Sequence, residues 1–407
     1  MSASATVEII TTATALDALE PEWAQLFAAS PAASPPLHWD WVREWWRIYG
    51  PIYGQGGRGL RLFTVRRDGR LIGILPLYRR NFWRDEFLEP RRLLFLSAGE
   101  APGDRTEGEY QDLLCLPDEG PACLAAIQEA LLDGQAGPWD LLSLSYVAET
   151  SSLHPWVAGM AKRGLEVVVG EQRQYPIANL TEGYEAYVAR LSYQSRRQVR
   201  YQVRAAAKDG LVLEIATNPK ETDQFFDDLS RLHQQHWTAR GKPGSFASKR
   251  FTAFHRMLCR KHVPTGFAVL ARLRAAEEVL AVLYGFVVRD KFNLYQSGRA
   301  CDHGGHVASP GTAAHLLLMP QLLDRGVSKY DFLAGAAFYK DRLSTEHQSF
   351  RNIQVWNPTW RVMARTVYGG LKRRAIRLVP GWGSRNGAVG PSAATQASGA
   401  RNGEAVS

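Results

Sequence analysis

The sequence predicts an α/β (α+β) protein of two tandem domains, each a mixed, mostly antiparallel sheet flanked by helices. Segments with the period of two typical of strands alternate with segments that have the helical period of 3.6. Asp68-Gly69 separates two apolar stretches and is a strong signal for a tight hairpin turn. The order of elements in the first half recurs in the second after about 200 residues, as in a duplicated domain.

Length and composition agree with this organisation. The 407 residues exceed what one core usually organises, and 45% hydrophobic with 22% charged residues is typical of soluble globular proteins. The N-terminus lacks a signal-peptide pattern, and no stretch has the roughly 18 apolar residues that a membrane span needs. Four cysteines without a Cys-x-x-Cys pair predict a reducing, cytoplasmic location. The net charge of +9 permits an anionic partner but selects none.

Periodicity predicts the elements of the first half. Aromatic residues at helical spacing predict a helix at His38–Tyr49, and the turn at Asp68-Gly69 joins the strands Leu60–Arg67 and Leu71–Tyr78. In order, the predicted elements are a strand at 7–12, helices at 16–29 and 38–49, strands at 60–67, 71–78, 93–97 and 112–116, a helix at 122–132, a strand at 140–146, a helix at 152–163 and a long strand at 165–179.

The second half repeats this plan after a long connecting helix at Tyr184–Lys208. The remaining predictions are a strand at 212–217, helices at 222–239 and 249–262, strands at 267–274, 279–289 and 292–298, a helix at 312–325, and strands at 329–333 and 348–356. Domains are therefore expected at 1–180 and 181–358. A basic, apolar helix is expected at 359–380, and a disordered Gly/Ala/Ser-rich tail at 381–407.

The segment Lys291–Lys340 carries the strongest functional signal. It predicts a strand, a Gly/His loop that opens into an apolar helix, a short strand, and a Gly-Ala turn followed by a Tyr-Lys pair. A glycine-containing loop before a helix collects backbone N–H groups and the positive end of the helix dipole, which suits a pyrophosphate. The alternative is that Pro310-Gly311 only forms a turn and starts the helix. The predicted cofactor-binding residues are Val307, Ser309, Gly311, Thr312 and Ala313.

The corresponding loop of the first half is acidic. Asp118 and Glu119 precede its helix, and two carboxylates would repel a pyrophosphate. Cofactor binding is therefore expected in the second domain only, and the first domain is expected to be structural or to form one wall of the groove for the other substrate, the acceptor.

These residues resemble the GNAT acyl-CoA N-acyltransferases. The double copy, together with SPGTAAHLLL and LLDRGVSKYDFLAGAAFYK, is similar to the CelD/BcsL-type acetyltransferases of cellulose and exopolysaccharide biosynthesis, which are related to the FemAB peptidyltransferases. The resemblance covers Tyr184 to Trp356 well and the first half more loosely. One position departs from the GNAT loop signature, because Ala308 stands where Gln or Arg is expected.

The resemblance implies an acyltransferase that uses acetyl-CoA, or another acyl-CoA, as co-substrate and no metal. A sugar, polysaccharide precursor or similar small acceptor would attack the thioester directly in a ternary complex. Tyr339 would protonate the CoA thiolate, or else be an aromatic wedge beside Gly335. Asp331 is the candidate base, with local capping and a water chain without any base as the alternatives. The predicted substrate-binding residues are Lys340, His303, His306, Arg196 and Arg200.

Two charged patterns have competing interpretations. Cys301, His303 and His306 share a loop, but a zinc site normally draws four ligands, so these side chains are expected to line the loop without a metal. The second pattern is a stripe at every fourth residue, which is either a solvated helix face or a site for a phosphate, a lipid-linked sugar or a nucleic acid. Its members are Arg196, Arg200, Arg204 and Lys208.

Two other functions remain open at the level of sequence. One is a FemAB-like transfer from aminoacyl-tRNA, and the other is a catalytically degenerate scaffold in polysaccharide biosynthesis. DNA is not expected as a partner, because no recognition motif is present. The basic segment near Trp382 suits an anionic surface, so peripheral contact with the inner face of a membrane, or with polysaccharide-synthesis machinery, is a further expectation.

Overall fold

The computed structural model describes residues 4–80, 89–300, 305, 307, 309–335 and 337–367. His303 and His306, which we expected to line a loop without binding a metal, lie outside the described residues. The tail at 381–407 does so as well. The first half contains β1 (Thr6–Ile10), α1 (Ala13–Ala18), α2 (Glu20–Ala29), the 3-10 turn η1 (Pro35–Leu37), α3 (Trp39–Tyr53), β2 (Leu60–Arg67), β3 (Arg70–Arg79), β4 (Arg92–Phe95), β5 (Leu114–Cys115), α4 (Gly120–Leu132), β6 (Leu141–Ala148), α5 (Leu153–Lys162), β7 (Glu166–Val169) and β8 (Arg173–Asn179).

The second half follows the same succession. It contains α6 (Tyr184–Arg190), α7 (Tyr193–Lys208), β9 (Leu211–Ile215), α8 (Pro219–Thr238), the 3-10 turn η2 (Ser245–Ala247), α9 (Lys249–His262), β10 (Ala268–Ala275), β11 (Glu278–Val288), β12 (Lys291–Arg299), α10 (Pro310–Leu323), β13 (Lys329–Asp331), α11 (Phe338–Leu343) and β14 (Glu346–Trp356).

The structure differs from the predicted elements in two ways. Three predicted elements are each divided in two, and the short helix α11 is an addition. The helix expected at 184–208 is α6 and α7, because Ser192 accepts the N–H of Ser195 and caps a new helix there. The helix expected at 16–29 is α1 and α2, with Pro21 in the first turn of α2. The long strand expected at 165–179 is β7 and β8. Helix α11 was expected as part of a turn.

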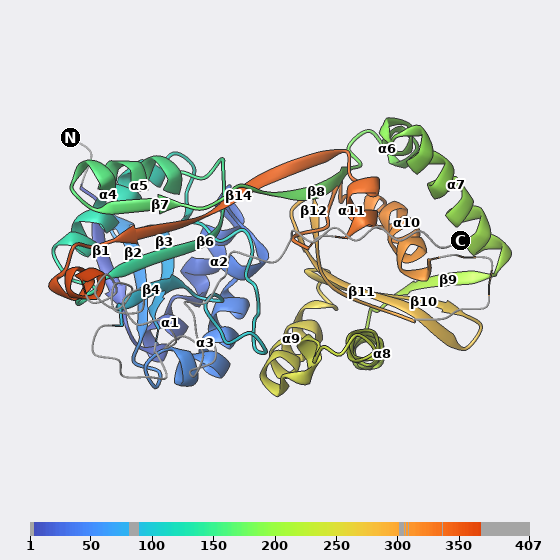
Figure 1. The fold of residues 1–407 in the computed structure, drawn as a ribbon, viewed down its shortest axis with the longest axis horizontal. Coiled ribbons are helices and arrows are strands. Elements are labelled where there is room, and N and C mark those ends of the chain that lie inside the picture. Colours follow the sequence, from blue (N-terminus) through green and yellow to red (C-terminus); the bar gives the residue numbers. More distant parts are fainter. Residues whose placement is uncertain are drawn as a thin grey trace, which may run out of the picture.

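The strands form one mixed, mostly antiparallel sheet that runs through both halves, as Figure 1 shows, so the predicted fold class is confirmed. The strand order along this sheet is β1-β2-β3-β4-β6-β14-β8-β13-β12-β11-β10-β9. Four antiparallel strands at each end lead to one parallel pair, β4 with β6 in the first half and β12 with β13 in the second. The two halves are therefore joined side by side with matching topology.

The halves exchange strands where they meet. Strand β8 of the first half pairs with β13 of the second, while β14 of the second half pairs with β6 and β7 of the first. The first residues of β14 also pair with β8. This explains the division at residues 170–172, because β7 and β8 pair with different parts of the same long strand.

The described residues form three hydrophobic cores. One lies between the sheet and α4 and α5, another between the sheet and α7 and α10, and the third is shared by the halves. In the shared core, Trp41 and Tyr49 of α3 pack edge-on against Phe254 of α9, with ring centroids 5.2 and 6.0 Å apart. The Trp-rich helix α3 is therefore covered by α9 of the other half. Within the described residues, no helix is both long and apolar enough to span a bilayer.

Candidate active site

The site begins where β12 and β13 separate. The two strands pair only over Lys291–Asn293 and Lys329–Asp331. Beyond this point β12 has a bulge at Tyr295, and the chain after β13 turns away through Leu333 (φ +53°). A bulge leaves backbone groups outside the regular ladder and bends the strand. The pairing therefore ends at Asn293 and Asp331, and a gap follows between the two segments.

A cavity of about 530 Å³ lies at the mouth of this gap, between the two halves. The first half contributes a loop that carries carboxylates, and the second contributes the bulged strand and the turn after β13. The lining residues are Pro102, Gly103, Arg105, Glu107, Glu109, Trp237, Lys242, Pro243, Gly244, Ser245, Leu294, Tyr295, Gln296, Ser297, Leu333, Ala334, Tyr339 and Lys340.

Glu109 is the most perturbed acid in this cavity. Its side chain is buried and its Oε2 accepts the N–H of Ala334 at 3.2 Å. Burial above all, together with the charges of Glu107 and Asp331, raises its pKa to about 8, although the N–H of Ala334 and the ammonium of Lys340 lower it. A carboxyl group with such a pKa exchanges protons near neutral pH, as a general base must.

The loop that carries Glu109 holds strained backbone conformations. Ser97, Glu107 and Tyr110 all have positive φ angles, between 41° and 67°, and none of them is a glycine. The side-chain amide of Gln111 donates to the carbonyl of Gly108 at 2.9 Å and holds the loop in place. Such strain persists only where the surroundings enforce it, and it gathers at functional sites.

Asp331, which we predicted as a candidate base, lies behind the wall of the cavity. Its side chain is fully buried, and one oxygen accepts from the hydroxyl of Tyr110 and lies 3.5 Å from Nζ of Lys291. The other accepts the N–H of Leu333 at 2.8 Å. These contacts join the Glu109 loop to the turn after β13 and favour a positioning role.

Tyr339 lies at the centre of the site. Its ring stacks on His315 at 5.1 Å between centroids, with 17° between the planes. Burial raises the pKa of Tyr339 to about 12, so its hydroxyl stays protonated at neutral pH. Burial lowers the pKa of His315 to about 3, and its Nδ1 lies 2.7 Å from the hydroxyl of Tyr330. A neutral, rigidly stacked phenol is suited to donate a proton or a hydrogen bond.

A second cavity of about 180 Å³ lies on the other side of Tyr339, between α7, α10 and α11. Oε1 of Gln202, which lines it, is buried without a hydrogen-bond partner in the described part of the chain. The lining residues are Ser195, Gln198, Val199, Gln202, Ser309, Thr312, Leu316, Phe338, Tyr339, Arg342 and Leu343. Tyr339 is thus common to both cavities.

The predicted cofactor residues surround the start of α10, next to the second cavity. Oγ of Ser309 accepts the N–H of Thr312 and caps the helix, while the N–H of Val307 donates to Oδ2 of Asp209 at 2.9 Å. Gly311 lies in the first turn, and Ala313 is buried in the core. An anion would have to replace the carboxylate of Asp209 to reach the N–H of Val307.

The predicted substrate residues are dispersed. Nζ of Lys340 lines the large cavity but donates to the carbonyls of Phe332 and Ala334 at 2.7 and 2.6 Å. Arg196 donates to the carbonyl of Ala189 at 2.7 Å, at the end of α6, and Arg200 is exposed on α7. The structure therefore does not bring these three side chains together.

Sequence reasoning missed two charged residues of the site. Glu109 lies in a loop without periodicity, and only the fold brings that loop against β12 and β13. Arg299 ends β12, and a Cβ atom on Gly311 would lie 3.4 Å from its Cδ, so Arg299 adds a cation to the start of α10. Its position at the end of the strand that leads into the Gly-containing loop was the sequence signal that could have identified it.

Comparison with known proteins agrees with this geometry. Residues 194–341 match the family model described as "Acetyltransferase (GNAT) domain". No curated protein sequence matches the chain. Among solved structures, FemX has 11% identity and a TM-score of 0.56 over 82% of this chain and 95% of its own. The C-terminal domain (DUF2156) of a provisionally named lysylphosphatidylglycerol synthetase from Agrobacterium fabrum has 9% identity and a TM-score of 0.51, over 89% and 97%.

The family match covers α7 to α11, which includes β12, α10 and Tyr339. At such low identity the solved structures inform on the fold alone. Residues 194–341 are therefore similar to GNAT acetyltransferase domains, and most of the chain has the fold seen in FemX.

Proposed function

We propose that the protein is an acyl-CoA-dependent acyltransferase with acetyl-CoA as donor and a sugar or polysaccharide precursor as acceptor. The observation that carries this proposal is the position of Tyr339, which borders both cavities. Two cavities that meet at one proton donor suit direct transfer between two bound substrates. The saccharide acceptor and a role in exopolysaccharide synthesis follow from the resemblance to the CelD/BcsL type.

The donor is assigned to the smaller cavity and the start of α10. The positive end of the dipole of α10 attracts the pyrophosphate, and Arg299 and Arg342 add positive charge at the same place. The acyl group would then lie in the gap between β12 and β13, beside Tyr339. Backbone N–H groups at the bulge of β12 are the candidates to stabilise the oxyanion.

The acceptor is assigned to the larger cavity. Its amine or hydroxyl attacks the thioester carbon, and Glu109 takes the proton that the attacking atom loses. The C–S bond then breaks, and Tyr339 donates its proton to the departing thiolate. Trp237 and Tyr295 offer aromatic surfaces for a sugar ring, while Glu107 offers a hydrogen-bond acceptor.

Binding of acetyl-CoA to the full chain tests the donor assignment by calorimetry. We expect saturable binding that Gly311→Glu abolishes, because a carboxylate in the first turn repels the pyrophosphate. That position is favourable for Glu in a helix, so folding should be retained. The control is Asp118→Asn at the corresponding loop of the first half, since Asn tolerates the positive φ of 66° there. Absence of binding by the unmodified protein would rule out the proposal.

Aminoacyl transfer from a charged tRNA is the second candidate, and α7 favours it. Arg197, Arg200, Arg204 and Lys208 are exposed on this helix, as are Tyr193 and Tyr201, and no residue of α7 is acidic. Cations interleaved with aromatic side chains suit an RNA backbone and its bases. Salt-sensitive tRNA binding without affinity for acetyl-CoA would identify this function.

The remaining alternative is a catalytically degenerate scaffold. Binding of acetyl-CoA without turnover on amino sugars would indicate that role.

A further inference from the structure

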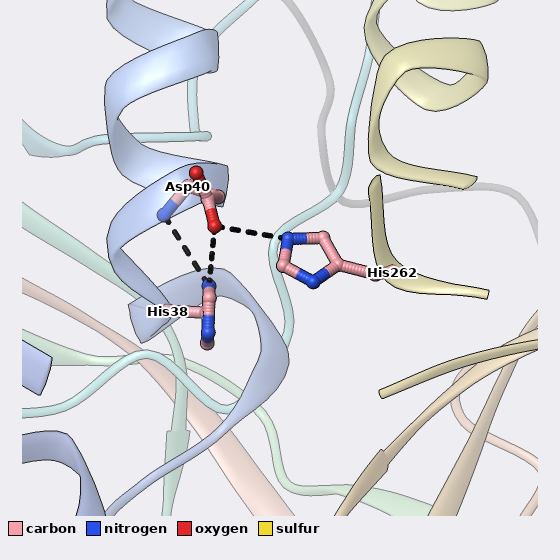
Figure 2. A group of neighbouring side chains, drawn as sticks. All are labelled: His38, Asp40 and His262. Carbon is pink, nitrogen blue, oxygen red and sulfur yellow. Dashed lines mark hydrogen bonds and ion pairs between the residues drawn. The ribbon is translucent and has the colours of Figure 1, made fainter. Parts of the chain in front are cut away.

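Three metal-ligand side chains meet at the contact between the two halves, away from both cavities. His38 precedes α3, Asp40 lies in its first turn, and His262 ends α9; Figure 2 shows all three pointing to one spot. Oδ2 of Asp40 lies 3.0 Å from Nε2 of His262 and 3.8 Å from Nδ1 of His38. The three ligand atoms all lie within 4.8 Å of one another.

The atoms that face one another are electron-pair donors. Nδ1 of His38 accepts the backbone N–H of Asp40 at 3.3 Å and is therefore unprotonated in this arrangement. A metal ion would take the place of this N–H, since an imidazole nitrogen has a single lone pair.

His262 completes the set. Its side chain is 7% exposed, and Nε2 is buried without a hydrogen-bond partner of suitable geometry in the described part of the chain, despite its closeness to Oδ2 of Asp40. A lone pair on Nε2 would repel Oδ2 at this distance of 3.0 Å. Either a hydrogen on Nε2 or a bound metal ion must therefore lie between the two atoms.

We propose that His38, Asp40 and His262 bind a divalent transition-metal ion, with zinc the best fit. A tetrahedral zinc site with bonds of roughly 2.1 Å has ligand atoms about 3.4 Å apart, between the two distances from Oδ2 of Asp40. Two imidazoles and one carboxylate are a frequent donor set for zinc and neighbouring metals. His38 is 24% exposed at its side chain, which leaves a fourth position for water.

Lys261 sets the expected strength of this site. Its ammonium contacts Oδ1 of Asp40, the carboxylate oxygen that does not face the histidines. This contact orients the carboxylate, as a partner of a ligand does, but its positive charge opposes a cation nearby. The ion would bridge α3 of the first half and α9 of the second, so binding should stabilise the contact between the halves.

The test uses the full chain, freed of any affinity tag and treated with a chelator, then titrated with zinc chloride. We expect one equivalent to bind and the thermal midpoint to rise with zinc. His262→Gln should weaken zinc binding by on the order of 100-fold, because a three-ligand site loses one ligand. The control His347→Gln alters an exposed histidine of β14 and should leave zinc binding unchanged.

Lys261→Met provides a second measurement with a definite sign. Removing the ammonium should raise zinc affinity several-fold, because one positive charge near the ion is lost. Circular dichroism of the chelated variants checks that each is folded. The proposal is overturned if zinc does not bind, or if His262→Gln binds zinc as tightly as the unmodified protein. A protonated His262 paired with Asp40 would then account for the geometry.

Discussion

At the scale of single residues, Glu109 defines the chemistry that we expect of the large cavity. Glu109→Gln keeps the shape and the contact with Ala334 but cannot take a proton. We expect kcat/KM to fall by about 100-fold or more, with acetyl-CoA binding retained. In the unmodified enzyme, kcat/KM should rise with pH and level off above about 8, the pKa of Glu109, and this rise should be absent from the variant.

The same substitution should change stability in the opposite direction. The pKa of Glu109 is raised from 4.5 to about 8, so folding favours the protonated form. The stability that it contributes is present below pH 4.5 and is lost as pH rises toward 8. Glu109→Gln should therefore raise the thermal midpoint at pH 8. Glu107→Gln serves as a comparison and should move the pH profile of kcat/KM to lower pH, because Glu107 raises the pKa of Glu109. If Glu109→Gln left kcat/KM unchanged, Glu109 would not be the base.

At the scale of elements, α11 is fastened to the turn after β13 by one lysine. The ammonium of Lys340 donates to the carbonyls of Phe332 and Ala334, and burial lowers its pKa. Lys340→Met should cost about 1 to 3 kcal/mol in the free energy of unfolding, because these buried carbonyls lose their donor. Denaturant unfolding measures this cost. A raised KM for the acceptor without loss of stability would instead show that Lys340 binds the substrate.

At the scale of the whole molecule, strand exchange and the shared core make the two halves one folding unit. Phe254 of α9 packs against Trp41 and Tyr49 of α3. Phe254→Ala should cost about 3 to 5 kcal/mol of unfolding free energy, because it leaves a hole in this core. We expect one cooperative transition, shifted as a whole, when fluorescence and circular dichroism are followed in denaturant. Two separated transitions would show that the halves unfold independently.

Local patterns predicted most of the fold because periodicity reports which face of an element is buried. The hairpin at Asp68-Gly69 and the succession of strands around α10 followed from such patterns. The division of 165–179 into β7 and β8 did not, because its cause is pairing with β14, far away in the sequence. The break before α7 had a local signal in Ser192, which the helical period of the arginines obscured.

The candidate site was partly predictable for the same reason. The start of α10 and Tyr339 carry local sequence signals, and both border the second cavity. Glu109 carries none, since its burial and raised pKa arise only when the loop of the first half meets the turn after β13. Likewise, Asp40 and His262 are more than 200 positions apart in the sequence.

By itself, the sequence determined the class of fold, the repeated plan of its halves, and the start of a helix after the Gly-containing loop of the second half. These properties depend on spacing between near neighbours in the chain. Only the tertiary structure decided that the halves exchange strands, that Glu109 joins Tyr339 in one cavity, and that two histidines and an aspartate meet between α3 and α9. Those properties depend on burial and on contacts between distant segments, which no local pattern records.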